Sequence, residues 1–186
     1  VRKEQKEQQV AIIHSSNDNE RTLRRIIAAY IAGYEKITIR GSNAASACED
    51  ARSKLSGLEI LDEKTDEGVL GVLSKGNEFD TNEILNRMHS ISTALFGLVV
   101  EAITGDGQMQ KEAARRETEI DRLYILALRT INHQSTKVSL AVCNALVAKI
   151  LERISDHVEL LYGEALKVRK DKAALASINK LKSIYL

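Results

Sequence analysis

Apolar residues in the second part of the chain recur at helical spacing over long stretches. From Thr81 they follow at steps of three and four residues, and the stretches at about 109–133 and 136–170 repeat this spacing. Such steps place apolar side chains on one face of a helix. The expected inner positions are Ile84, Met88, Ile91, Leu95, Leu98 and Ala102, then Ile120, Leu123, Ala127 and Ile131, then Val142, Leu146, Ile150, Ile154, Val158, Leu161 and Ala165. Three such helices, the first two separated by Gly105-Asp106-Gly107, predict an antiparallel bundle within residues 81–186.

Residues 1–80 follow a different pattern. Short apolar runs predict strands at 10–13, 36–39, 58–61 and 69–73, the last two joined by a turn at 66–68. Amphipathic stretches between the first three runs predict two helices, one beginning with Asn19 as its N-cap and ending at Gly33, the other at about 44–56. The order β-α-β-α-β-β indicates a small α/β module. With a terminal helix expected at about 173–184, the whole chain is predicted to be α+β and mostly helical.

Composition narrows the class of protein. The chain has 186 residues, of which 44% are hydrophobic and 28% charged, with a net charge of +1. This balance argues against a protein that coats nucleic acid, which would carry a basic excess. The two cysteines, Cys48 and Cys143, have no CxxC partner, a pattern typical of free thiols in a reducing compartment. The most apolar stretch, residues 95–100, is too short to span a bilayer. We therefore expect a cytoplasmic protein without membrane insertion.

Two helices carry an acid-x-x-x-acid pair, Glu117 with Asp121 and Glu152 with Asp156. Residues four apart lie on one helix face, so each pair presents two carboxylates side by side. Turning 100° per residue places both pairs outside the core, where a metal would lie between adjacent helices. Carboxylate ligands fit Mg, Mn, Fe or Zn. The alternative is that these acids are simply solvated on helices rich in lysine and arginine.

The remaining polar residues provide no catalytic constellation. No serine has a recognisable histidine and aspartate beside it, and no Gly-rich loop has the Walker spacing. His157 follows Asp156 and could be either a ligand or a packed histidine. We predict no catalytic residue and no enzymatic activity.

The segments RRETEIDRLYILALR and ILERISDHVELL resemble the two signature segments of the PhoU family, regulators of phosphate uptake. The resemblance implies a three-helix bundle whose motifs, at Glu117, Asp121, Glu152 and Asp156, hold iron or zinc at the surface. It also implies a homodimer that contacts a phosphate transporter or a signalling protein. The sequence departs from the family pattern at Ser155, where glycine is usual.

The first part of the chain is similar to archaeal PhoU-like proteins over RRIIAAYIAGYEKITI and GLEILDE. In those proteins an AbrB/SpoVT-type DNA-binding segment often precedes the corresponding region. The chain opens at Val1 with the polar run RKEQKEQQ, which we interpret as a cut inside a longer protein. The alternative function is therefore the effector and dimerisation part of a transcription regulator that contacts DNA only through an upstream segment.

Overall fold

A computed structural model of the chain describes residues 9–73, 79–104, 110–134, 137–168 and 171–185. These residues form six helices and four strands, which confirms the predicted fold class of a mostly helical protein with a small α/β module. The chain divides into two compact units, residues 1–80 with 128–137 and residues 81–127 with 138–186. The domain boundary between residues 80 and 81 stays a prediction. Among the described residues, no helix is both long and apolar enough to cross a membrane.

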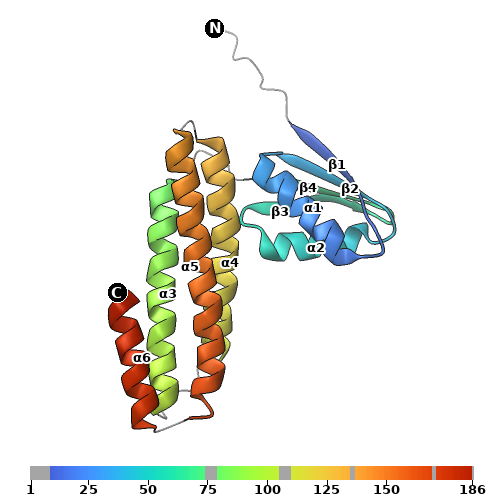
Figure 1. The fold of residues 1–186 in the computed structure, drawn as a ribbon. Coiled ribbons are helices and arrows are strands. Elements are labelled where there is room, and N and C mark those ends of the chain that lie inside the picture. The colour runs from blue at the N-terminus through green and yellow to red at the C-terminus, as the bar shows by residue number, and fades with distance from the viewer. Residues whose placement is uncertain (1–8, 74–78, 105–109, 135–136, 169–170, 186) are drawn as a thin grey trace. The chain divides into compact units, whose positions relative to one another are not determined.

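The first unit is a four-stranded sheet with two helices (Figure 1). Its order along the chain is β1 (Val10–His14), α1 (Asn19–Ala32), β2 (Lys36–Arg40), α2 (Ala44–Lys54), β3 (Leu58–Lys64) and β4 (Glu67–Val72). The strands lie in the order β1-β2-β4-β3, with β1 and β2 parallel across the α1 connection and the other pairs antiparallel. The predicted β-α-β-α-β-β order is thus observed.

Local chemistry sets the ends of α1. The helix is capped by Asp18, whose carboxylate accepts a hydrogen bond from the Arg21 backbone N–H at 3.0 Å, so the prediction of Asn19 as the cap was wrong by one residue. Asp and Asn are both favourable N-cap residues, so the sequence does not show which of the neighbours Asp18 and Asn19 caps the helix. Gly33 ends the helix in the left-handed conformation, as predicted, with φ of 101°.

The turn between β3 and β4 is shorter than predicted. Lys64 pairs directly with Glu67, so Gly68 lies within β4 rather than in the turn. At this position the Cys48 sulfur of α2 occupies the space that a Cβ would need. Glycine is therefore required here by close helix–sheet packing.

The last turn of α4 (Gln110–His133) also belongs to the first unit. The buried Arg129 guanidinium donates hydrogen bonds to the carbonyls of Tyr30 and Tyr34, and it stacks 4.6 Å from the centre of the Tyr30 ring. Asn132 donates to the Ile31 carbonyl at 3.0 Å. A cation at a helix C-terminus is favourable, and its N–H groups add donors to carbonyls of the last turn and of the residues just after it. Side chains of α4, distant in the sequence, thus donate hydrogen bonds to the carbonyls at the end of α1.

The second unit is a bundle of α3 (Thr81–Thr104), α4 and α5 (Val138–Ala165), with α6 (Lys172–Tyr185) packed along α3 (Figure 1). Every predicted inner residue of α3 is buried, as are Ile120 and Ala127 of α4. The break predicted at Gly105-Asp106-Gly107 lies outside the described residues.

The predicted inner face of α5 was partly wrong. Val158 and Ala165 are buried and Ile154 and Leu161 are half-buried, but three other expected core residues are exposed, namely Val142, Leu146 and Ile150. The buried positions are instead Ala148, Leu151, Ser155, Val158, Tyr162 and Ala165. Because α5 carries apolar residues on more than one side, its period could not identify the buried side.

A buried serine pair marks the contact between α3 and α5. The Ser92 and Ser155 hydroxyls lie 2.8 Å apart, and each is also within hydrogen-bond distance of a carbonyl of its own helix, that of Met88 for Ser92 and that of Leu151 for Ser155. Since each hydroxyl has one proton, one serine donates to the other, which in turn donates to its own carbonyl. Buried hydroxyls need such partners, since leaving one unpaired is costly. Ser155, which departs from the usual glycine, is therefore matched by Ser92.

We predict that Ser155→Ala lowers the free energy of unfolding by about 0.5–1.5 kcal/mol, the usual net value of one hydrogen bond. Urea unfolding followed by circular dichroism measures it. Ser92→Ala should cost a similar amount, and the double variant less than both together, because one shared bond is lost. The control is Ser90→Ala on the exposed side of α3, which should change stability little. Additive losses would show that the two hydroxyls are not coupled.

Candidate metal centre

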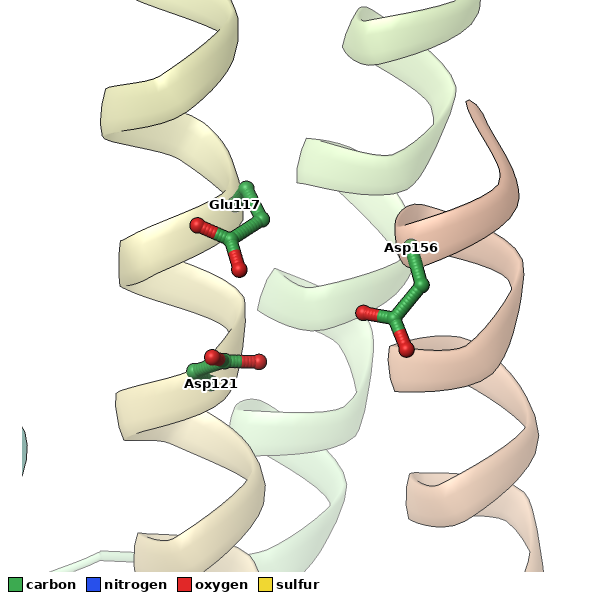
Figure 2. A group of neighbouring side chains, drawn as sticks. All are labelled: Glu117, Asp121 and Asp156. Atoms are coloured by element: carbon green, nitrogen blue, oxygen red, sulfur yellow. The ribbon is translucent and has the colours of Figure 1, made fainter. Parts of the chain in front are cut away.

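Three carboxylates meet on the side of the bundle where α4 and α5 are neighbours. Glu117, Asp121 and Asp156 each place an oxygen within 4.8 Å of the others (Figure 2). Figure 2 shows the two α4 side chains one turn apart, with Asp156 pointing toward them from α5. Three of the four residues predicted from the sequence are therefore brought together.

The buried contacts of each helix set this arrangement. On α4, the buried Ile120 faces the core, so Glu117 and Asp121 flank it on the edge of that face. On α5, Asp156 directly follows the buried Ser155 and is turned about 100° from it. Core packing thus directs the acids of both helices to the boundary between them.

The cluster is electrostatically unfavourable for its own charges. Partial burial raises the pKa of Glu117 to about 7, and the charges of Asp121, Glu159 and Asp156 and a hydrogen bond with Asp121 act in the same direction. Like charges at short range disfavour ionisation. A divalent cation bound between these groups would relieve the repulsion.

Glu159 was missed by the sequence analysis. It lies one turn after Asp156 on α5, and its charge contributes to the raised pKa of Glu117. Its side chain is exposed and it is outside the three-carboxylate group. The i, i+3 spacing from Asp156 was the available signal, since residues three apart share a helix face.

Glu152, the fourth predicted residue, is placed differently. Both of its carboxylate oxygens accept from the Lys149 ammonium at 2.6 Å, and that ammonium lies 5.1 Å from the centre of the Tyr124 ring. Glu152 is therefore held by its own cation within α5 and does not join the other three acids. The ammonium also lies close enough to Asp156 for its charge to interact.

His157 makes a local contact instead of joining the cluster. Its Nδ1 lies 2.6 Å from the Arg153 carbonyl oxygen, four residues earlier on the same helix, and its side chain is exposed. Neither this geometry nor the group of three carboxylates assigns it a ligand role.

The donor set fits a divalent cation. Oxygen-only carboxylate ligands suit Mg²⁺ and Mn²⁺ and are also compatible with Fe²⁺ and Zn²⁺. Three residues leave coordination positions for water or for a bound partner. Both cysteines are outside the site, Cys48 buried in the first unit and Cys143 exposed on α5.

Comparison with protein families places a PhoU domain at residues 85–161. All four predicted acids, the three that cluster and Glu152, lie within the matched residues. The resemblance drawn from the two signature segments is confirmed. No curated protein and no solved structure was found to match the chain.

We predict that Glu117→Gln stabilises the metal-free protein above about pH 7. The folded-state pKa of Glu117, about 7, exceeds its ordinary value of 4.5, so its ionisation opposes folding. That penalty is absent below the ordinary pKa, grows as the pH rises from about 4.5 to 7, and is fully present above 7. The gain in free energy of unfolding at high pH should be at least about 0.2–0.5 kcal/mol, the size of one repulsive i, i+4 pair.

Urea unfolding in the presence of a chelator, at pH values on both sides of this range, measures the effect. The control is Glu164→Gln, an exposed acid paired with Lys167, which should give no gain at either pH. A Glu117→Gln variant less stable than the wild type at high pH would contradict the repulsion.

Proposed function

We propose that this chain regulates phosphate uptake and phosphate signalling through protein contacts, because the PhoU domain at residues 85–161 indicates a regulatory role in phosphate transport. PhoU domains are regulatory rather than enzymatic, which agrees with the expectation that the chain has no catalytic activity. The observation that carries the proposal is that the carboxylates of the site lie inside the matched residues, 85–161.

In this proposal Glu117, Asp121 and Asp156 bind a divalent cation, with iron or zinc expected and magnesium or manganese also suited. A bound cation would supply positive charge to three carboxylates that repel one another. Because Glu117 and Asp121 lie on α4 and Asp156 lies on α5, holding one cation between them would keep these two helices at a fixed distance. A partner protein could bind only when the two helices are at that distance, or it could supply further ligands to the cation.

The partners of the proposed regulator are a phosphate transporter or a signalling protein, and a second copy of the chain. We place its action in the cytoplasm, on the support of the free thiols. The alternative, the effector and dimerisation part of a DNA-binding regulator, stays a prediction. It would gain support if a longer protein containing this chain bound its own promoter.

Metal binding can be tested residue by residue. The chelator-treated chain, titrated in a calorimeter with Fe²⁺, Zn²⁺, Mn²⁺ or Mg²⁺, should bind at least one of these ions. Asp121→Asn and Asp156→Asn should each weaken that binding by at least about tenfold, because each removes a ligand. Glu152→Gln is the matched control, an acid of the same motif held by Lys149, and should bind like the wild type. Absence of binding by the wild type would refute the metal site.

The regulatory role can be tested in the organism that carries the gene. Deleting the gene should abolish the fall in uptake of labelled phosphate that follows a rise in external phosphate. The wild-type gene should restore the response. The double variant Asp121→Asn/Asp156→Asn, expressed at equal level, should not restore it if the cation is needed. Uptake that responds normally after deletion would contradict the proposed function.

A further inference from the structure

A groove runs along the bundle between α5 and α6, with α3 beneath it. Figure 1 shows α3 between these two helices, and α3 packs against both. The groove has a volume of about 450 Å³. Apart from Arg153 and His157 of α5, its lining is apolar, and no acid is among the described residues that line it.

The groove has the size and the lining of a small-molecule site. Such sites usually enclose about 300–1,000 Å³ and combine apolar walls with a few polar groups that orient the ligand. Here Phe96 and Val158 are buried at the base, while Ile150 is 57% and Ile184 is 75% exposed on opposite walls. A molecule in the groove would remove this exposed apolar surface from water, which is favourable.

Arg153 is the cation on the α5 wall of the groove. Within the part of the chain that the structure describes, its guanidinium has no ion-pair partner. The neighbouring acids of α5 are directed elsewhere, since Glu152 accepts from Lys149 and Asp156 points toward the acids of α4 (Figure 2). An exposed arginine without a carboxylate, beside an apolar wall, favours a ligand that brings its own negative charge.

His157 lies one turn after Arg153 and is held in a fixed orientation. Its Nδ1 lies 2.6 Å from the Arg153 carbonyl oxygen. Because a carbonyl oxygen only accepts, Nδ1 is the donor, and Nε2 is the nitrogen that remains for a bound molecule. A carboxyl group beside these two residues would pair with the guanidinium and share one proton with Nε2.

We propose that the groove binds a free fatty acid, with its alkyl chain against the apolar walls and its carboxylate beside Arg153 and His157. The planar guanidinium matches a carboxylate through two parallel hydrogen bonds. The size of the groove selects a single chain. At about 30 Å³ for a group as large as a water molecule, it holds roughly fifteen such groups, whereas a membrane phospholipid brings two long chains.

The length of the groove sets the length of the chain. From Arg153 to Leu161 the α5 wall extends over eight residues, or about 12 Å. An extended chain advances about 1.2 Å per bond, as the extended polypeptide backbone does with its three bonds per residue. About ten bonds therefore span this wall, and we expect the affinity to stop rising at roughly ten to twelve carbons.

Isothermal titration calorimetry of the whole chain tests the proposal with octanoate, decanoate and dodecanoate, each below its micelle-forming concentration. One decanoate should bind per chain, and the affinity should rise about fourfold per methylene from octanoate to decanoate, because each added methylene is buried. The titrations contain a chelator and no phosphate, so the outcome is independent of the metal site and of the proposed regulation. Absence of saturable decanoate binding, or an affinity independent of chain length, would overturn the proposal.

Two probes with the same chain test the role of the carboxylate. The uncharged decanol and the cationic decyltrimethylammonium should both bind more weakly than decanoate. Arg153→Gln should weaken decanoate binding at least about tenfold, the usual worth of a hydrogen bond to a charged group, and leave decanol binding unchanged. Equal binding of the anionic and cationic probes, or an equal loss for decanoate and decanol, would contradict the assigned role of Arg153.

A charge placed in the groove tests the location. Ile184→Glu should keep the wild-type circular dichroism, since the side chain is exposed, and weaken decanoate binding at least about tenfold by repulsion and desolvation. Ile150→Glu on the opposite wall should have the same effect and serves if the first variant does not fold. The matched control is Leu160→Glu, 68% exposed on α5 but outside the lining, which should bind like the wild type. A folded groove variant with wild-type affinity would overturn the placement.

Discussion

The rotation of α5 about its own axis is the constraint on which the rest of the bundle depends. The hydroxyl pair of Ser92 and Ser155 fixes it, because the bond requires Ser155 to point directly at α3. With 100° between successive residues, Asp156 must then turn toward one side and Ile154 toward the other. One side faces α4 and its two acids, and on the other side the half-buried Ile154 packs against the core. A small buried side chain thus determines where the larger functional ones lie.

The repulsion within the cluster of acids lowers the free energy of unfolding, and the remainder of the fold must offset this loss. Glu117 is partly buried beside Asp121 and Asp156, a placement that core packing alone would not favour. By contrast, most other acids of the bundle with a described partner are paired with a cation nearby, such as Glu112 with Arg115 and Arg116. A carboxyl group whose pKa is raised by acids gathered from two helices marks a candidate functional site.

The sequence predicted the helices well and their faces unevenly. On α3 every residue that the period predicted to face inward, from Ile84 to Ala102, is buried, although the buried Phe96 and Val99 beside them were not predicted. On α5 apolar residues surround most of the helix, and the decision between sides rests on Ala148 and Ser155, whose small size permits close approach of α3. Likewise, the spacing of the acid-x-x-x-acid pair does not distinguish Glu152 from Asp156 as a ligand. Only the folded structure shows that Lys149 pairs with Glu152 and that Asp156 lies beside the acids of α4.

These arrangements make the spacing of α4 and α5 the part of the bundle that responds to charge. The α3–α5 contact is held by buried side chains and a hydroxyl pair, which do not titrate in the physiological range. The α4–α5 boundary instead holds Glu117, Asp121 and Asp156, whose mutual repulsion falls as their oxygens move apart and is relieved by a proton or a cation. A change in ionic state would therefore act on one boundary while the other stays fixed.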